Sequence, residues 1–186
     1  MEKLAIDGGT PVRTKPFASW PVYGDLELQL LKEVLESGKW GGAGSTKPGY
    51  QAKLPEMERK FAELQDANYA VSVANGTVAI TVALQAAGVK PGDEVIIPPY
   101  TFIATAPAAL AYGAIPVFAD IEEDTLLIDP EKVESLITPK TKAIIAVHIA
   151  GAPANMTRLN EIAKKHNLVL IEDAAQGSSP YFCVNS

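Results

Sequence analysis

The sequence has 186 residues, of which 47% are hydrophobic and 20% charged, a balance typical of one compact soluble domain or a large part of one. The formal net charge of −6 argues against a nucleic-acid partner, because phosphate binding requires a basic surface. Cys183 is the only cysteine, so no internal disulfide can form and we expect a cytoplasmic protein. The first residues lack the apolar core of a signal peptide, and prolines and a glycine interrupt the most apolar stretches. We therefore expect no membrane segment. Two histidines are too few for a His-rich site, so no metal is predicted.

The first 68 residues form the first predicted segment, made of helices and a loop. Apolar residues at helical spacing predict a helix over residues 25–37 (DLELQLLKEVLES), which ends at Gly38, and a second over residues 55–64. Residues 40–50 (WGGAGSTKPGY) are too rich in glycine for a packed element, so they are predicted to be a loop. That loop is either a flexible surface connection or a segment close to a ligand.

From residue 69 onward, short β-branched runs alternate with helical patterns. Strands are predicted at residues 69–74, 94–98, 115–119, 143–149 and 168–172, and helices at 77–87, 101–112, 130–137 and 156–166. The strands are continuous apolar runs, which is typical of parallel strands covered on both faces. The alternation predicts an α/β fold with a mostly parallel sheet and flanking helices. Residues 69–186 are therefore assigned to this second, α/β segment.

Ligands of α/β sheets bind beyond the carboxyl ends of the strands, so the residues that follow each strand are candidates for a site. After the first predicted strand, Asn75-Gly76-Thr77 opens a helix. Its backbone N–H groups and the helix dipole favour an anion such as phosphate. An ordinary helix N-cap is the alternative interpretation, and these residues alone favour it. The glycine-rich fingerprints of dinucleotide and nucleoside-triphosphate sites are absent from the sequence.

Two further strand ends carry aromatic and acidic residues. After the second strand, Pro98-Pro99-Tyr100-Thr101-Phe102 directs aromatic side chains toward the strand ends, where Phe102 either stacks on a flat ring or belongs to the core. Glu172 and Asp173 end the fifth strand, and neighbouring side chains on a strand point in opposite directions, so the two acids have separate tasks. One can bind a cation or a protonated ring nitrogen, whereas a salt-bridged or capping carboxylate is the alternative. A phosphate site, a stacking aromatic and an acid together suit pyridoxal phosphate.

The same motifs, in the same order, resemble the DegT/DnrJ/EryC1/StrS family of sugar and cyclitol aminotransferases, which have the aspartate-aminotransferase fold (fold type I). The resemblance extends from IDGG through WPVYG, ESGKWGG, ANGTVAI, EVIIPPYTFIATA, GAIPVFADIE and AVHIAGAPANM to VLIEDAAQG. It implies that Gly76 and Thr77 bind the phosphate of pyridoxal 5′-phosphate and that Phe102 stacks on its pyridine ring. It also implies that Asp173 pairs with the ring nitrogen and keeps it protonated, and that Gln176 approaches the 3-hydroxyl.

The resemblance further implies a reaction and its partners. Family members take an amino group from glutamate or glutamine in a ping-pong reaction and transfer it to a keto-sugar or keto-cyclitol, in amino-sugar, cell-surface polysaccharide or antibiotic-precursor biosynthesis. They act as homodimers, and the loop at residues 40–50 lies near the substrate site and the subunit interface. The opening IDGG and the pair Trp20-Pro21 resemble the cyclitol and antibiotic-precursor branches.

The sequence departs from the family pattern after Asp173. The family's Schiff-base lysine follows the aspartate by a few tens of residues, whereas residues 174–186 contain no lysine, and Lys164 and Lys165 precede the aspartate on a predicted helix. The pattern therefore predicts a chain without a catalytic lysine and with negligible transaminase turnover. It also predicts a missing C-terminal small domain and no sheet neighbour for residues 69–74. We interpret the chain as a fragment, a frameshifted reading or a truncated product.

Two other interpretations remain open at this point. The chain could be a non-catalytic truncated paralogue that docks on a full-length homologue through the dimer surface. It could also be a cofactor- or nucleotide-binding α/β domain unrelated to amino transfer, which the missing glycine fingerprints disfavour.

Overall fold

The computed structural model describes residues 3–17, 19–40 and 52–177. The chain divides into two units, Met1–Glu56 and Met57–Ser186, and each is described by itself. The division predicted from the sequence, into residues 1–68 and 69–186, remains a proposal. Most of the predicted glycine-rich loop at residues 40–50, and Cys183, lie outside the described residues.

The first unit contains a short 3-10 helix, η1 (Ala5–Asp7), and α1 (Asp25–Ser37), which has the bounds predicted from its apolar spacing. A carboxylate oxygen of Glu27 accepts the N–H of Gly24 at 2.7 Å at the start of α1, and this bond lowers the pKa of Glu27. The helix ends where Gly38 takes a φ of 66°, a left-handed conformation that favours glycine. The next helix, α2 (Lys53–Leu64), begins two residues before its predicted start.

The second unit is built on a four-stranded parallel sheet in the order β2-β1-β3-β4. Its strands are β1 (Glu94–Ile97), β2 (Ile115–Phe118), β3 (Thr141–Val147) and β4 (Val169–Asp173). All four lie within two residues of positions predicted from continuous apolar runs. The sheet therefore confirms the predicted α/β class and its parallel strands.

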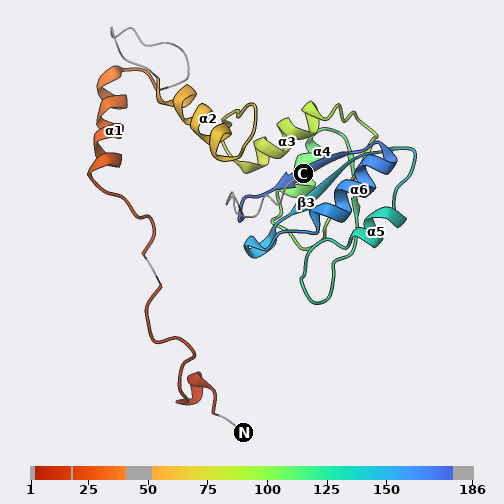
Figure 1. Ribbon diagram of the computed structural model, residues 1–186, viewed down its shortest axis with the longest axis horizontal. Helices are drawn as coiled ribbons and strands as arrows, with labels where there is room; N and C mark the ends of the chain where they lie inside the picture. The colour runs from red at the N-terminus through yellow and green to blue at the C-terminus, as the bar shows by residue number, and fades with distance from the viewer. Residues whose placement is uncertain (1–2, 18, 41–51, 178–186) are drawn as a thin grey trace. The chain divides into compact units, whose positions relative to one another are not determined.

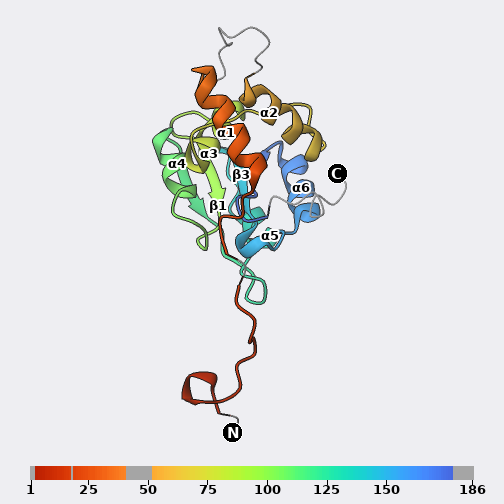
Figure 2. The same ribbon diagram turned by 90° about the vertical axis from the view of Figure 1, so that its left-hand side faces the viewer.

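Helices cover both faces of this sheet (Figures 1 and 2). They are α3 (Gly76–Ala86), α4 (Thr105–Ala111), α5 (Pro130–Ser135) and α6 (Met156–His166). On one face, Leu84 of α3 and residues of α4 pack against Ile145 and its neighbours on β1 and β3. On the other face, Leu159 of α6 and residues of α5 pack against Ile144. These four named side chains are fully buried or nearly so, and the two layers of core fix the sheet between its helices.

The helix ends follow from side chains that satisfy backbone groups. Asp129 caps α5 by accepting the N–H of Glu131 at 2.9 Å, and Pro130 occupies the first position, where its missing N–H costs nothing. Asn155 caps α6 by accepting the N–H of Arg158 at 3.1 Å. The helix α4 is shorter than predicted. The prediction covered residues 101–112, whereas the helix begins only at Thr105 and ends at Ala111.

The predicted strand at residues 69–74 is wrong for the described chain, because the segment pairs with no strand there. The N–H of Ser72 instead donates to the side chain of Glu58 at 2.8 Å. Tyr69 and Val71 are 87% and 75% exposed, so the apolar run is not buried between two helical layers as its composition predicted. An apolar run becomes a strand only when a neighbour supplies the ladder bonds, and none of the described strands does so here. The predicted absence of a sheet neighbour for this segment stays a prediction.

No helix among the described residues combines the length and the apolar character that crossing a bilayer requires.

Candidate active site

The strand order places the candidate site at the carboxyl edge of the sheet, between β1 and β3. From β1 the chain moves outward to β2, and it then returns to the other side of β1 for β3 and β4. This reversal is a topological switch point, because the chain goes from β1 to α4 on one face of the sheet and from β3 to α6 on the other face. Ligands of α/β sheets bind at such points. The segments that follow β1, β3 and β4 all reach this edge (Figure 1).

The start of α3 lies toward the same edge. The end of α3 leads through a short turn, with the N–H of Lys90 bonded to Asp93 at 2.9 Å, into the amino end of β1. Because an 11-residue helix is about 16 Å long, its first residues lie at the opposite, carboxyl end of the sheet. The side chain of Asn75 accepts the N–H of Val78 at 3.0 Å, so Asn75 is the helix N-cap. The N-cap interpretation is thus correct for Asn75.

Gly76 and Thr77 keep backbone N–H groups that the helix cannot use, since the first N–H groups of an α-helix have no partner within it. A Cβ placed on Gly76 would meet no atom within 4 Å, so the backbone at this position is open to an incoming group. The cap and an anion site are therefore compatible, because the cap uses the N–H of Val78 and leaves the two preceding N–H groups available.

Phe102 lies in the connection between β1 and α4 and is 71% exposed, which excludes the alternative that it belongs to the described core. Its carbonyl oxygen accepts the N–H of Thr105 at 3.2 Å, and the Thr101 and Thr105 hydroxyl groups bond each other at 2.9 Å. Thr105 is fully buried, so these bonds attach the exposed aromatic residue to a fixed point of the fold.

Glu172 and Asp173 have the separate environments that their alternation predicted. Leu170 packs with the cluster on the α5 and α6 side of the sheet, and Ile171 packs with the cluster on the α3 and α4 side. By the period of two, Glu172 points to the α5 and α6 side and Asp173 to the α3 and α4 side. Glu172 is bonded to His148 at 3.0 Å, so it is the paired, structural carboxylate.

Asp173 is half-buried and lies on the sheet face that α3 covers. Its Oδ1 accepts the N–H of Ala175 at 3.2 Å. α3 contacts β4, which brings the helix that begins at Gly76 and the strand that ends at Asp173 together. The structure thus places the predicted anion-binding and acidic residues on one face and toward one edge of the sheet.

Gln176 is held through its side chain rather than projecting freely. Its Oε1 accepts the N–H of Ala150 at 2.6 Å, which joins the segment after β4 to the short 3-10 helix η2 (Ile149–Gly151) after β3. The sequence did not single out His148 or Ala150 as functional, although both lie at the carboxyl edge. A polar residue directly after a buried apolar strand was the available signal for His148.

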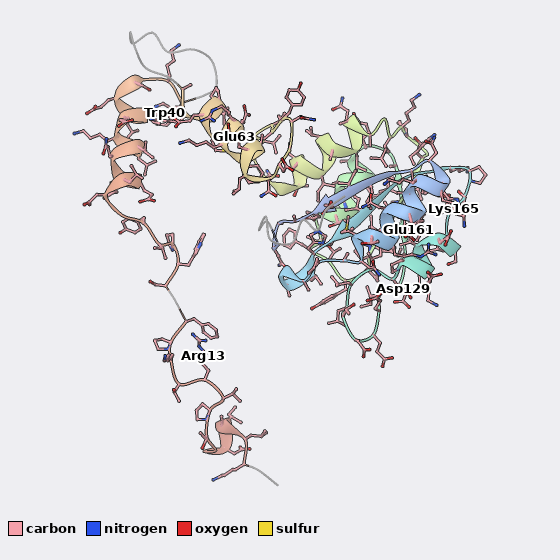
Figure 3. All side chains as sticks on the ribbon, viewed as in Figure 1. Arg13, Trp40, Glu63, Asp129, Glu161 and Lys165 are labelled. Atoms are coloured by element: carbon pink, nitrogen blue, oxygen red, sulfur yellow. The ribbon has the colours of Figure 1, made fainter. Side chains whose placement is uncertain are left out.

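The lysines that precede Asp173 in the sequence lie away from this edge. Lys165, labelled in Figure 3, is in the last turn of α6, which leads into the amino end of β4. Its ammonium group bonds Glu134 at 2.7 Å. Lys165 and then His166 hold the pKa of Glu134 at about 2, well below its ordinary value. Lys164 is its exposed neighbour in the same turn. Neither lysine lies beside Asp173, as the sequence predicted from their position on a helix.

The residues at the carboxyl edge fit a phosphorylated aromatic ring with a basic nitrogen. The start of α3 offers two N–H donors and an open glycine to a phosphate, the β1–α4 connection offers an exposed aromatic face, and β4 ends in a carboxylate that can pair with a protonated nitrogen. Among the described residues no group of three or more histidines, cysteines or acids is arranged to hold a metal ion.

Comparison with known proteins identifies the family. The model of the DegT/DnrJ/EryC1/StrS aminotransferase family matches residues 22–181. The chain belongs to this family. It is 45% identical over 180 residues to an L-glutamine:2-deoxy-scyllo-inosose aminotransferase of Streptomyces kanamyceticus. That alignment covers 97% of this chain and 42% of the relative, so the chain spans less than half the length of that enzyme.

Solved structures show the same fold. A 3-amino-5-hydroxybenzoic acid synthase superposes with a TM-score of 0.79 at 39% identity, over 87% of this chain and 40% of the synthase. The NtdA protein of Bacillus subtilis, solved with bound PMP (pyridoxamine phosphate) cofactor, superposes with a TM-score of 0.75 at 39% identity. This match covers 82% of this chain and 33% of NtdA. These neighbours confirm the predicted fold type I architecture and show that the family uses the pyridoxal phosphate cofactor in its pyridoxal or pyridoxamine form.

Proposed function

We propose that this chain provides the cofactor-binding part of an aminotransferase that transfers an amino group from glutamine or glutamate to a keto-cyclitol or keto-sugar. The observation that carries the proposal is the arrangement of the carboxyl edge. The open start of α3 and the acid that ends β4 lie on one face of the sheet, and the exposed Phe102 follows β1, which β3 separates from β4. The relatives support the acceptor class, because several are L-glutamine:2-deoxy-scyllo-inosose aminotransferases.

In this proposal each residue performs one binding task. Gly76 and Thr77 donate backbone N–H groups to the phosphate, with the N-terminal end of the α3 dipole favouring its charge. Phe102 covers one face of the pyridine ring and excludes water from it. Asp173 accepts a hydrogen bond from the protonated ring nitrogen, and Gln176 approaches the ring's 3-hydroxyl from the segment that Ala150 holds.

When bound, pyridoxal phosphate supplies an electron sink for the carbon from which a proton is removed, and a protonated ring nitrogen strengthens that sink. The contribution of this chain is to hold that proton at the nitrogen through the carboxylate of Asp173. The carboxylate is itself oriented by the N–H of Ala175 at 3.2 Å, so the ring meets an acceptor whose direction is already fixed.

Mapping of the ligand by nuclear magnetic resonance tests this proposal. Pyridoxamine phosphate is the suitable probe, because it binds without forming a covalent bond to a lysine. We expect it to shift the amide signals of Gly76, Thr77, Phe102 and Asp173 while leaving those of the helices α5 and α6 unchanged. Inorganic phosphate is expected to shift only the signals at the start of α3. Shifts confined to another surface, or none at millimolar ligand, would show that the carboxyl edge does not bind the cofactor.

We also propose that the protein acts as a cytoplasmic homodimer. Leu28, Leu31 and Leu35 follow one another at helical spacing on α1 and are 54%, 61% and 61% exposed. An apolar stripe of this kind is typical of a helix that packs against a partner. Light scattering after gel filtration tests the proposal. A wild-type dimer that becomes monomeric in the Leu31→Glu variant supports the proposal. A wild-type chain that is monomeric at about 100 micromolar, a concentration at which even a weak dimer forms, contradicts it.

A further inference from the structure

His148 follows β3 directly and is 5% exposed, although it has no place in the binding scheme described above. All of its polar groups are bonded. Its backbone N–H donates to the carbonyl oxygen of Asp173 at 3.1 Å, its Nδ1 accepts the N–H of Ala154 at 3.2 Å, and its Nε2 lies 3.0 Å from a carboxylate oxygen of Glu172. A buried imidazole with both ring nitrogens bonded has a fixed orientation.

These bonds define the tautomer of the ring. A neutral imidazole has one N–H donor and one acceptor nitrogen. Because Nδ1 accepts the N–H of Ala154, the proton resides on Nε2, which donates to Glu172. The ring therefore links the loop before α6 to the last residues of β4.

Two other contacts reinforce this junction. Gln176 accepts the N–H of Ala150 at 2.6 Å. Gly177 lies against the histidine, since a Cβ placed on it would lie 3.2 Å from the Cβ of His148. The segment from Glu172 to Gly177 is thus attached at both of its ends to the connection after β3, and Asp173 lies between these attachments.

The two faces of β4 decide what the junction does. Glu172 is bonded to His148 on the α5 and α6 side, whereas Asp173 points to the α3 and α4 side, where the candidate site lies. His148 therefore does not reach the site. It fixes the rotation of the end of β4 from the opposite face, and the direction of the Asp173 carboxylate depends on that rotation.

We propose that His148 is a positioning residue that orients Asp173 and Gln176 toward the cofactor ring through its Nε2–H bond to Glu172. The inference rests on the proposed function, because it names what holds the ring-binding residues of the same site. It differs from a general stabilising role, since loss of the bond should weaken recognition of the ring nitrogen and leave phosphate binding at the start of α3 intact.

Two ligands separate these roles. Pyridoxamine phosphate carries the phosphate, the ring hydroxyl and the ring nitrogen. 1-Deazapyridoxamine phosphate has carbon in place of the ring nitrogen and is otherwise identical. The ratio of their dissociation constants for the 186-residue chain measures recognition of the nitrogen, and the constant for 1-deazapyridoxamine phosphate measures binding of the remaining groups, the phosphate among them.

Two substitutions of His148 form a matched pair. His148→Gln places an amide N–H where Nε2–H stood and keeps the donor to Glu172, while it loses the acceptor for Ala154. His148→Asn places an amide oxygen where Nδ1 stood and keeps the acceptor for Ala154, while it loses the donor to Glu172. Both remove the same ring and each keeps one of its two bonds, so the comparison shows whether recognition of the ring nitrogen depends on the bond to Glu172 or on the bond to Ala154.

We expect His148→Asn to reduce the preference for pyridoxamine phosphate by about tenfold, the effect of a misdirected hydrogen bond to a charged group. The same variant should bind 1-deazapyridoxamine phosphate within about twofold of wild type, an amount below 1 kcal/mol, and His148→Gln should retain most of the preference. If His148→Asn keeps the preference for pyridoxamine phosphate, or if its affinity for both ligands falls by the same factor, His148 is not a positioning residue. If the wild-type chain shows no preference, the proposed function itself fails, and the inference fails with it.

A measurement on the unmodified chain tests the inference even if a variant does not fold. Nitrogen-15 correlation spectra of the imidazole distinguish the two neutral tautomers. The proposal requires the Nε2–H form in the free chain and a change in the His148 Nε2–H signal when pyridoxamine phosphate binds on the opposite face of β4. An Nδ1–H form, or an Nε2–H signal that does not respond to the bound ligand, would overturn it.

Discussion

Replacing Gly76 with alanine separates the structural and the functional roles of the start of α3. Gly76 is the first residue of the helix, its φ is outside the left-handed region, and an added Cβ would meet no atom within 4 Å. Alanine is favoured over glycine in helices by about 0.5–1 kcal/mol, so Gly76→Ala is expected to stabilise the fold by up to about 1 kcal/mol. With a denaturant slope of about 2 kcal/mol/M, the urea midpoint should rise by about 0.25–0.5 M.

The same methyl group would lie where a phosphate approaches the backbone. Overpacking at a close contact costs about 1–3 kcal/mol, so binding of pyridoxamine phosphate should weaken by about tenfold or more. Circular dichroism in urea and isothermal titration with the ligand measure the two effects on one sample. Gly113→Ala is the control, because Gly113 has a φ of +73° and its added Cβ would lie 3.1 Å from Pro91. It should destabilise the fold by about 1 kcal/mol or more without changing affinity.

The reasoning would be refuted by either of two results. A lower urea midpoint for Gly76→Ala would show that the space before α3 is filled by other atoms. Unchanged affinity for pyridoxamine phosphate would show that no ligand approaches this backbone, and Asn75-Gly76-Thr77 would then be an N-cap alone.

Three further predictions concern the packing and charges that hold the site in place. Leu84→Ala, which truncates a fully buried side chain of α3, should destabilise the fold by about 2–5 kcal/mol. Leu110→Ala on α4, where the side chain is 58% exposed, should change stability by less than about 0.5 kcal/mol. Equal urea midpoints for the two variants would contradict the assigned core. Asn75→Ala should lower the free energy of unfolding by about 1 kcal/mol and accelerate hydrogen exchange in the first turn of α3, because the bond from the N–H of Val78 to the Asn75 side chain is lost. Unchanged hydrogen exchange would count against the cap. The bonds to Lys165 and His166 hold the pKa of Glu134 at about 2, below its ordinary 4.5, so their stabilisation is complete above about pH 4.5 and is lost as the pH falls toward 2. The difference in urea midpoint between wild type and Glu134→Gln should therefore shrink between pH 5.5 and pH 2.5, and a difference independent of pH would exclude this linkage.

Elements with their own local signals were predictable from the sequence. The helix α1 matches its prediction because apolar spacing and a terminal glycine both lie within the segment. The helix α6 matches for a similar reason, since Asn155 caps its start and Asn167 ends it with a φ of 53°. The parallel strands were predictable because burial on both faces produces continuous apolar runs, which do not depend on strand order.

Features that depend on a partner elsewhere in the chain were not predictable in the same way. Residues 69–74 have the composition of a buried strand, but strand formation requires ladder bonds from a neighbour, and Glu58 takes the N–H of Ser72 instead. The alternation of Glu172 and Asp173 predicted two separate environments, but it did not predict which residue pairs with Glu172. His148 is 24 residues away in sequence, and only the register of β3 with β4 brings the two together.

The affinity of Asp173→Asn for pyridoxamine phosphate tests the central claim most directly. Asparagine keeps the oxygen that accepts the N–H of Ala175 but removes the charge that would pair with the ring nitrogen. The matched control is Asp120→Asn after β2, whose side chain likewise accepts a backbone N–H, that of Ile121 at 2.9 Å. The account predicts that Asp173→Asn loses about 2 kcal/mol of binding, about 30-fold in affinity, while Asp120→Asn binds like wild type. Equal affinities for wild type and Asp173→Asn would contradict the claim that the carboxyl edge of this sheet holds the cofactor ring.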